Sequence, residues 1–346
     1  MPVPLTVIPA PPAGPAHSRA VLDTVLPALR DCLDGGAPLA VLPAGDGPAA
    51  AARAVLRADE PLEPGTDLVV LTSGSTGGGK GVLLSAGALR ASATATTDRL
   101  GGPGSWLLAL PPSAVGGLQV LVRSALAGRE PAVLERGEPL AAALARLPAG
   151  DRRYTSLVPT QLRRYLADEP DALAAFDAVL VGGAATDAAL LAAARAAGVR
   201  VHTTYGMSET AGGCVYDGRP LDGVRVRVDQ GVELAGPVLA HGYRLDPAGT
   251  AEAFGPDADG RVWFRTRDAG TLDADGVLTV TGRLDDVVIS GGVNVSPQAV
   301  EAALREHPSV ADAVVTGLPD PEWGQRVVAA VVPAPGAVPD LSLIHI

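Results

Sequence analysis

The sequence predicts an α/β protein, in which a large N-terminal domain of layered sheets and helices with a β-rich subdomain precedes a small α+β C-terminal domain. Three patterns indicate this organisation. Short apolar runs alternate with alanine-rich stretches in the first 200 residues, antiparallel patterns begin near Gly223, and strands around one helix follow Arg283. We therefore expect an N-terminal domain over residues 1–283 and a C-terminal domain over residues 284–346.

The N-terminal domain is expected to alternate strands with helices. Strands that alternate with helices in this way usually lie parallel within one sheet. The predicted strands cover residues 68–71, 106–110 and 178–181, and the helices that follow them cover 86–100, 118–127 and 187–197.

The sequence pattern changes after about residue 223. Arginine-valine alternation over 224–228 and the turn Asp273-Ala274-Asp275-Gly276 predict antiparallel strands. In the C-terminal domain, Ser296 is the expected N-cap of a helix that begins at Pro297 and runs to about His307. Strands are expected over 287–290, 313–316 and 326–332.

Composition limits the class of function. The 346 residues are 47% hydrophobic with a formal net charge of −11, so we expect a globular chain without the basic face that nucleic acids require. The uncharged run over 100–122 is broken by glycine and proline, so no membrane span is expected. Two cysteines, Cys32 and Cys214, and the absence of a secretory pattern favour the cytoplasm.

The segment Leu68–Gly81 changes from an apolar run into hydroxyls, glycines and one lysine. Loops of this kind surround phosphate oxygens with backbone N–H groups. The segment departs from a Walker A loop, because Gly81 replaces the hydroxyl that would hold Mg²⁺. The predicted phosphate-binding residues are Thr72, Ser73, Gly74, Ser75, Thr76, Gly77 and Lys80.

Two further blocks predict the rest of a nucleotide site in the N-terminal domain. The first places small residues directly after a strand, where a flat ring can approach the backbone. The second, over 204–210, combines an aromatic face, a flexible glycine, a carboxylate suited to Mg²⁺ and hydroxyls. The candidate residues are Gly182, Gly183, Ala184, Tyr205, Gly206, Glu209 and Thr210.

Two later segments carry charged candidates. Asp268 is expected to accept hydrogen bonds from ribose hydroxyls, as carboxylates do in other nucleotide sites. Arg283 and Asp285 form a charged joint that leads to the turn Gly291-Gly292. The plainer alternatives stay open: aspartates in such hairpins are commonly turn residues, and Glu209 suits the start of a helix.

The ordered series of these blocks resembles the adenylate-forming superfamily of acyl-CoA synthetases, firefly luciferases and peptide-synthetase adenylation domains. The resemblance rests on Ser-Gly-Ser-Thr-Gly before Lys80, Tyr-Gly-Met-Ser-Glu-Thr from Tyr205, and Gly-Arg-Leu-Asp-Asp from Gly282, and runs from about Asp67 to Arg326. Residues 154–161 and 212–218 resemble one subgroup, the o-succinylbenzoate-CoA ligases of menaquinone synthesis.

The resemblance implies a two-step reaction with ATP, Mg²⁺ and coenzyme A. A carboxylate attacks the α-phosphorus of ATP and expels pyrophosphate, and the thiol of coenzyme A then attacks the acyl-adenylate. It implies that Lys80, Glu209 and Thr76 are catalytic, that Glu209 holds Mg²⁺, and that Tyr205 stacks on adenine beside Gly183 and Ala184.

The resemblance also implies roles for the later residues. Asp268 and Arg283 would hold the ribose, and the small C-terminal domain would be mobile, rotating about Asp285 to bring Gly291 and Gly292 to the pantetheine channel. The substrate pocket is expected to include Thr160, Gln161 and Arg163.

Three departures from the family pattern stand out. Arg267 precedes Asp268 where relatives have glycine, and the segment around Ser113 lacks a histidine that is common there. Relatives also continue to a Ser-Gly-Lys segment, whereas this chain ends at Ile346 without one. We therefore expect an incomplete C-terminal domain and impaired adenylation.

Other functions compatible with the sequence are a ligase for a different aryl or acyl carboxylate, because pocket residues set substrate choice, and a nucleotide-binding protein without turnover. A P-loop phosphotransferase would form ADP, but Gly81 and the lack of a Walker B strand argue against it. The expected partners are small molecules only, and the oligomeric state stays open, with a homodimer among the alternatives.

Overall fold

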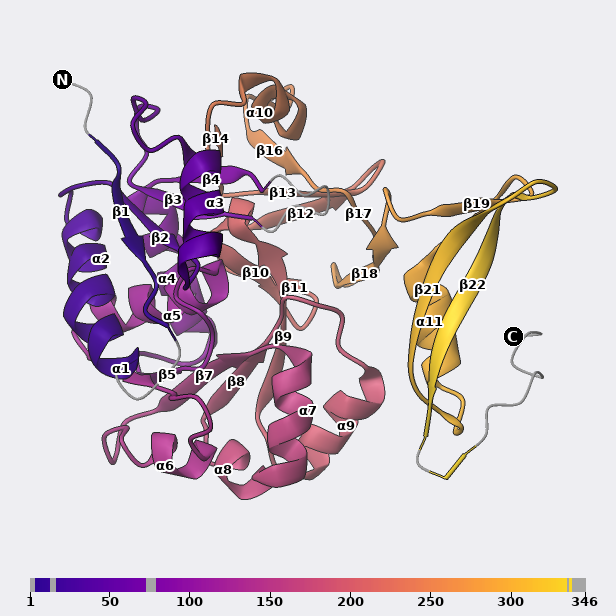
Figure 1. Cartoon of the computed structure of the whole chain (residues 1–346), viewed down its shortest axis with the longest axis horizontal. Helices are drawn as coiled ribbons and strands as arrows, with labels where there is room; N and C mark the ends of the chain where they lie inside the picture. The colour runs from indigo at the N-terminus through magenta and orange to yellow at the C-terminus, as the bar shows by residue number, and fades with distance from the viewer. Residues whose placement is uncertain (1–3, 13–16, 73–78, 335, 338–346) are drawn as a thin grey trace. The chain divides into compact units, whose positions relative to one another are not determined.

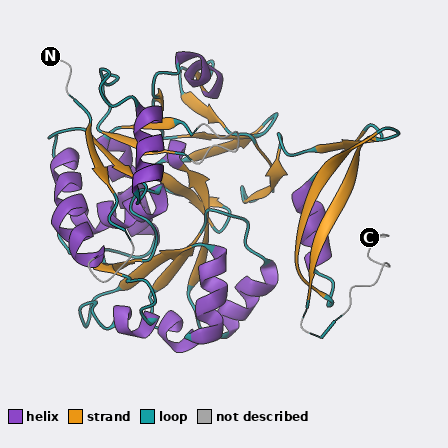
Figure 2. Cartoon of the chain, in the orientation of Figure 1, coloured by secondary structure: helices purple, strands orange, loops and turns teal. Residues whose placement is uncertain are grey.

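The computed structural model describes residues 4–12, 17–72, 79–334 and 336–337. The chain divides into two compact units, coloured along the sequence in Figure 1 and by secondary structure in Figure 2. Unit 1 comprises Met1–Arg225 and Leu234–Phe264, and unit 2 comprises Val226–Glu233 and Arg265–Ile346. The predicted domain boundary between residues 283 and 284 concerns motion: it predicts that residues 284–346 move as one domain. That boundary stays a prediction.

The first sheet of unit 1 has the strand order β1-β2-β3-β4-β14. Its strands are β1 (Thr6–Pro9), β2 (Leu39–Leu42), β3 (Leu68–Leu71), β4 (Gly81–Leu84) and β14 (Gly242–Tyr243). Strands β1, β2 and β3 are parallel, whereas β4 and β14 are antiparallel to their neighbours. In the described part of the chain, four helices occur between β1 and β3: α1 (His17–Ala20), η1 (Val21–Val25), α2 (Leu26–Leu33) and α3 (Asp46–Leu56).

The second sheet of unit 1 has the order β11-β10-β9-β8-β7-β5-β6. Its strands are β5 (Ser105–Leu108), β6 (Ala132–Val133), β7 (Arg153–Leu157), β8 (Ala178–Val181), β9 (Val201–Met207), β10 (Gly212–Tyr216) and β11 (Arg219–Pro220). The five strands from β6 to β9 in this order are parallel, as the alternation of strands and helices predicts. Strands β10 and β11 are antiparallel additions.

Alanine- and leucine-rich helices cover this second sheet. They are α4 (Ala86–Arg99), α5 (Val115–Leu126), α6 (Leu140–Leu144), α7 (Pro159–Asp168), α8 (Pro170–Ala174) and α9 (Ala188–Ala196). The apolar faces of α6, α7, α8 and α9 bury a core with the strands that includes Leu107, Leu162, Phe176 and Val179, all at 0% exposure. Burial of a large apolar side chain contributes roughly 1.5–3 kcal/mol, so this core holds the strand ends in fixed positions.

One strand departs from the sequence-based expectation. The segment after Lys80 forms β4, which pairs antiparallel with β3, so the glycine-rich loop joins two neighbouring strands rather than a strand and a helix. Helix α4 begins only after Ser85, whose hydroxyl caps it by accepting from the N–H of Ala88. Strands β3 and β4 therefore pair as neighbours on either side of residues 73–78, which lie outside the described residues.

The remaining elements of unit 1 follow β14. Helix α10 (Pro247–Ala253) leads into the antiparallel pair β15 (Phe254–Pro256) and β16 (Val262–Arg265). The ring of Phe254 lies 5.8 Å from that of Tyr243 and 4.9 Å from that of Phe264, so an aromatic cluster fixes β14 against this hairpin. Strands β12 (Arg225–Val228) and β13 (Val232–Ala235) precede β14, and the chain passes from unit 1 to unit 2 and back within them. The antiparallel pairing of β15 with β16 confirms the expected change to antiparallel β structure.

Unit 2 contains a hairpin and a small sheet. The hairpin joins β17 (Asp268–Leu272) and β18 (Leu278–Arg283), and the sheet has the order β20-β19-β22-β21. Its strands are β19 (Val288–Ser290), β20 (Val293–Val295), β21 (Val310–Asp320) and β22 (Gly324–Pro333), with helix α11 (Pro297–Arg305) against β21. Ser296 accepts a hydrogen bond from the N–H of Ala299, which confirms the predicted N-cap.

None of the helices in the described part of the chain combines the length and the apolar character that crossing a bilayer requires.

Candidate active site

The glycine-rich loop is closed at its base by Thr72 and Lys80. The N–H of Thr72 donates to the carbonyl of Lys80 at 2.9 Å, and the N–H of Lys80 donates to Thr72 Oγ1 at 3.2 Å. A Cβ at Gly79 would lie 2.3 Å from the carbonyl oxygen of Thr72, so only glycine fits there. The predicted phosphate contacts of Ser73, Gly74, Ser75, Thr76 and Gly77 lie outside the described residues.

The ammonium of Lys80 lies beside Tyr243 and Asp246. Its Nζ is 4.4 Å from the centroid of the Tyr243 ring and 3.5 Å from Asp246 Oδ2. The Lys80 side chain is half exposed, so each of these contacts contributes on the order of 0.5–1 kcal/mol or less. The side chain is thus directed but remains accessible to a ligand.

Glu209 lies on a one-turn 3-10 helix, η2 (Ser208–Thr210), between β9 and β10. The hydroxyl of Tyr243 donates to Glu209 Oε1 at 3.0 Å, and the N–H of Ala240 donates to the carbonyl of Glu209 at 2.8 Å. Glu209 and Lys80 therefore both contact Tyr243. The structure brings two predicted site residues together around a tyrosine that the sequence analysis did not select.

The residue that ends η2 has a strained backbone. Ala211 is fully buried and adopts φ 50° and ψ 36°, a left-handed conformation that costs non-glycine residues roughly 1–2 kcal/mol. Its carbonyl accepts two hydrogen bonds, from Ser92 Oγ at 3.0 Å and from Gln119 Nε2 at 2.7 Å. These buried donors, on α4 and α5, hold the turn that carries Glu209.

The predicted adenine side shows why its residues are small. A Cβ at Gly182 would lie 2.2 Å from Thr204 Oγ1, and Gly183 has φ 80°, so both positions favour glycine. Gly206 has φ 155°, and a Cβ there would lie 2.2 Å from the carbonyl oxygen of Gly212. The exposed Ala184 follows these glycines.

Tyr205 and Thr210 occupy the same block as Glu209. Tyr205 lies on β9 opposite Val215 of β10 and is partly exposed. The hydroxyl of Thr210 is fully buried, accepts from the N–H of Met207 at 2.9 Å and donates to the carbonyl of Gly212 at 2.7 Å. Thr210 therefore shapes the turn, and the nucleotide contacts of both residues stay predictions.

In unit 2, Arg283 lies between two of the predicted aspartates. It makes a two-pronged hydrogen bond to Asp285 at 2.8 and 2.9 Å, and its Nη1 is 3.7 Å from Oδ1 of the mostly buried Asp268. Because of the hydrogen bonds from Arg283, the pKa of Asp285 lies below its usual value. Arg267, the departure from the family pattern, is 3.8 Å from Asp285 Oδ2.

The turn Gly291-Gly292 links β19 to β20 with only two residues. Their φ angles of 57° and 82° are typical of a type I′ turn, which requires positive φ at both positions. A Cβ at Gly291 would lie 2.5 Å from Cε3 of Trp323. Glycine is therefore required on structural grounds, and a contact with pantetheine stays a prediction.

Unit 1 contains a cavity of about 880 Å³ near one of the predicted substrate-pocket residues, and the substrate contacts themselves stay predictions. Gln161 lines it, donating to the carbonyl of Ala109 at 2.8 Å, and so does Ser113. Thr160 and Arg163 are not among its lining residues, while Arg164 is. The half-exposed Arg163 lies 3.9 Å from Asp187.

The described residues contain no cluster of three or more His, Cys, Asp or Glu side chains that could enclose a metal ion. Mg²⁺ commonly binds to proteins through one or two carboxylates, with water and substrate phosphates completing the octahedron. A single carboxylate at Glu209, which contacts the same tyrosine as Lys80, fits that mode of binding.

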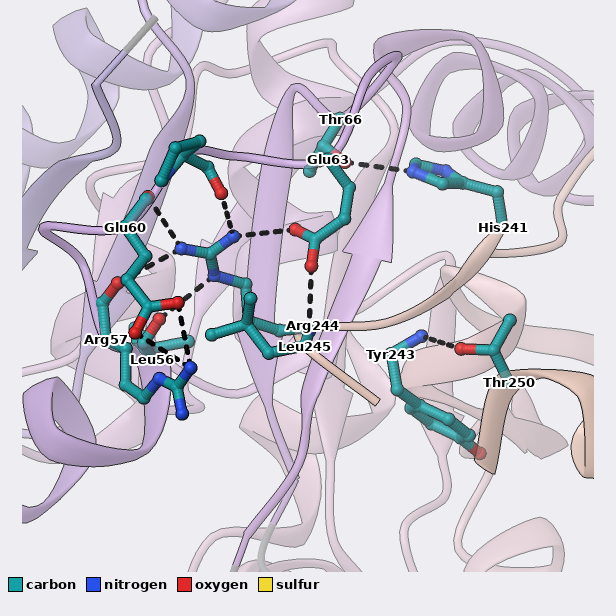
Figure 3. A network of polar contacts seen from close by, with 11 residues as sticks. Leu56, Arg57, Glu60, Glu63, Thr66, His241, Tyr243, Arg244, Leu245 and Thr250 are labelled. Carbon is teal, nitrogen blue, oxygen red and sulfur yellow. Dashed lines mark hydrogen bonds and ion pairs between the residues drawn. The ribbon is translucent and has the colours of Figure 1, made fainter. Parts of the chain in front are cut away.

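Figure 3 shows how the segment after Tyr243 is anchored. The side chain of Arg244 is 0% exposed and uses all five of its N–H donors. They reach the carbonyls of Leu56 (3.0 Å), Arg57 (3.0 Å), Glu60 (2.7 Å) and Pro61 (2.6 Å), and Glu63 Oε2 (2.8 Å). Arg244 thereby ties β14 to the C-terminal end of α3.

Tyr243, Arg244 and Asp246 were not predicted from the sequence. A cap signal was present, because Asp246 precedes Pro247, and Asp246 does accept a hydrogen bond from the N–H of Gly249 at 2.8 Å. The approach of Tyr243 to Lys80 depends on the pairing of β14 with β4, in which Tyr243 lies opposite Val82. No local pattern encodes a pairing across 160 residues.

Known proteins resemble both the sequence and the fold. A probable 2-succinylbenzoate–CoA ligase of Mycobacterium tuberculosis is 49% identical over 339 residues, which cover 94% of this chain and 85% of that protein. The 2-succinylbenzoate–CoA ligase of Geobacillus kaustophilus is 35% identical over 299 residues, which cover 79% of this chain and 60% of that protein.

Among solved structures, wild-type E. coli MenE with a bound m phenylether-linked analogue of OSB-AMS matches with a TM-score of 0.74 at 26% identity, covering 99% of this chain and 81% of that chain. Residues 18–268 match the family described as AMP-binding enzyme, and residues 299–345 match the AMP-binding enzyme C-terminal domain. The chain therefore belongs to the AMP-binding enzyme family.

Proposed function

We propose that this chain is an ATP-dependent, AMP-forming ligase that converts 2-succinylbenzoate into its coenzyme A thioester through an acyl-adenylate. The observation that carries the proposal is the 49% identity, over 94% of the chain, to a probable 2-succinylbenzoate–CoA ligase. The arrangement of Lys80, Tyr243 and Glu209 supports it, because these residues place a cation and a carboxylate next to a phosphate-type loop.

In the first step, a carboxylate oxygen of the acid attacks the α-phosphorus of ATP. The bond from that phosphorus to the bridging oxygen breaks, and pyrophosphate leaves. Lys80 and the loop N–H groups offset the negative charge that collects on the phosphate oxygens. Glu209 would hold Mg²⁺, which when bound neutralises part of the same charge. Tyr205 is proposed to stack on the adenine beside Gly183 and Ala184.

In the second step, the sulfur of coenzyme A attacks the acyl carbon of the adenylate, the thiol proton is released, and AMP leaves. We assign Asp268 and Arg283 to the ribose, Asp285 to the joint about which the C-terminal domain turns, and the Gly291-Gly292 turn to the pantetheine side. The hydrogen bonds between Arg283 and Asp285 support a defined geometry at that joint.

The proposal requires only small-molecule partners, namely the carboxylic acid, ATP and coenzyme A, and places the reaction in the cytoplasm. The two cysteines support a reducing compartment, because Cys32 and Cys214 are both buried and unpaired. A homodimer is compatible with this function.

The test is to incubate the purified chain with Mg²⁺, ATP and one acid at a time, and to identify the nucleotide product. We expect pyrophosphate and AMP, with 2-succinylbenzoate preferred over benzoate and a fatty acid. Equal rates with all three acids would contradict the substrate assignment. Formation of ADP would indicate a phosphotransferase, and ATP binding without pyrophosphate from any acid would indicate a nucleotide-binding protein.

A further inference from the structure

We propose that Tyr243 is a positioning residue that orients two charged groups of the ATP site at once, the carboxylate of Glu209 through its hydroxyl and the ammonium of Lys80 through its ring. This inference rests on the proposed function, in which Glu209 and Lys80 bind Mg²⁺ and the phosphates of ATP. It adds a residue from a distant part of the chain to that site.

The hydroxyl and the ring of Tyr243 contact different residues. Its hydroxyl donates to Glu209 Oε1 at 3.0 Å, which restricts rotation of the carboxylate. Its ring lies 4.4 Å from Lys80 Nζ, which places the ammonium on the negative face of the aromatic system. Removing the hydroxyl alone should therefore affect Glu209, whereas removing the ring should affect Lys80 as well.

Tyr243 can orient other groups because it is itself held firmly. Only 8% of it is exposed, and its N–H donates to Thr250 Oγ1 at 2.9 Å. The next residue is the fully bonded Arg244, and Phe254 packs edge-on against the ring at 5.8 Å. Figure 3 shows Tyr243, the last residue of β14, and Arg244, which follows it in the chain. A side chain fixed on a packed strand loses little further entropy when a ligand binds.

The test compares Tyr243→Phe and Tyr243→Leu with the wild type. A matched control is Tyr154→Phe, because Tyr154 is also buried in unit 1 but its hydroxyl donates to the carbonyls of Leu100 and Gly102. ATP binding is measured by calorimetry at a series of Mg²⁺ concentrations, without acid or coenzyme A. This readout does not require turnover.

For Tyr243→Phe we expect the Mg²⁺ concentration for half-maximal ATP binding to rise about five- to tenfold, with ATP affinity at saturating Mg²⁺ close to wild type. For Tyr243→Leu we expect ATP affinity at saturating Mg²⁺ to fall as well, by about threefold or more. Tyr154→Phe should leave both quantities unchanged. If Tyr243→Leu does not fold, the isosteric Phe variant decides the matter.

The proposal is overturned if Tyr243→Phe has the wild-type Mg²⁺ requirement, if Tyr154→Phe shows the same shift, or if the wild type does not bind ATP. It is also overturned if Glu209→Gln leaves the Mg²⁺ requirement unchanged. Failure of the proposed ligase activity appears separately, as a wild-type protein that binds ATP with Mg²⁺ but releases no pyrophosphate with any acid.

Discussion

At the scale of single residues, Arg244 is the most completely bonded charged side chain described above. Its five donors satisfy four carbonyls and the carboxylate of Glu63, and Oε1 of Glu63 also accepts a hydrogen bond from the N–H of Leu245 at 2.7 Å. Leu245 has φ 55°, so the bond from Glu63 also holds a strained backbone. A lysine cannot reproduce this fork of donors.

We therefore expect Arg244→Lys to lower the free energy of unfolding by about 3 kcal/mol, because the three donors of a lysine leave several of these carbonyls without partners. Urea denaturation of the purified variant measures this. The control is Arg57→Lys, whose side chain is 55% exposed and pairs with Glu60 on the surface. That change should stay within about 0.5 kcal/mol. A similar loss in both variants would contradict the special role of Arg244.

The same network predicts a pH dependence. Partial burial raises the pKa of Glu63, but hydrogen bonds from Leu245 and Arg244 lower it by more, so its pKa lies below its ordinary value of 4.5. A group with a depressed pKa stabilises the fold above its unfolded-state pKa, and this contribution is lost as the pH falls through the folded-state value. Glu63→Gln should therefore flatten the loss of stability below pH 4.5. If the free energy of unfolding of Glu63→Gln falls with decreasing pH as steeply as that of the wild type, the prediction is wrong.

The cysteines give a third prediction at this scale. Burial raises the pKa of Cys214 to about 12, and burial together with Asp67 raises that of Cys32 to about 12. Because the thiolate is the nucleophile, iodoacetamide should label neither residue in the folded protein near pH 8, and should label both in urea. Mass spectrometry of the digested protein measures the extent of labelling. Rapid labelling of Cys214 in the folded state would contradict its burial.

At the scale of elements, the turn η2 depends on the helices packed beside it. Gln119→Leu removes a buried donor to the strained Ala211, so we expect a loss of about 1–2 kcal/mol in unfolding free energy. Adding Ala211→Gly should recover part of it, because glycine adopts positive φ freely. Ser124→Ala is the control, since that buried hydroxyl bonds only within its own helix, to the carbonyl of Val120. No recovery in the double variant would argue against strain at Ala211.

Elements whose signals are local were predictable. Strands β3 and β8 have the bounds that their apolar runs indicate, and the Ser296 cap with Pro297 marked the start of α11. Strand β4 was not predicted, because four residues after a glycine-rich loop become a strand only when β3 and β14 are available on both sides. Pairing partners far apart in sequence leave little local trace.

At the scale of the whole molecule, the sequence motifs predicted a nucleotide site of a known family. They did not predict which residues from distant segments pack around it. The ordered glycines, Lys80, Glu209 and the Asp268–Arg283 pair were selected because together they resemble the motifs of a known family, and their ligand contacts stay predictions. Tyr243 was not recognisable, since an isolated tyrosine after glycine is more often a core residue, and Arg244 reads as an exposed charge. The approach of Tyr243 to Lys80 becomes visible only from the pairing of β14 with β4 in three dimensions.

The bonds of Arg244 also make the segment after α3 necessary for holding Tyr243 beside Lys80 and Glu209. The peptide groups at positions 56–61 receive the guanidinium, so cutting the backbone there would release β14 and loosen the tyrosine beneath the lysine. Proteolytic cleavage of the connection after α3 would therefore weaken nucleotide binding, although the cleaved bond lies outside the proposed nucleotide site.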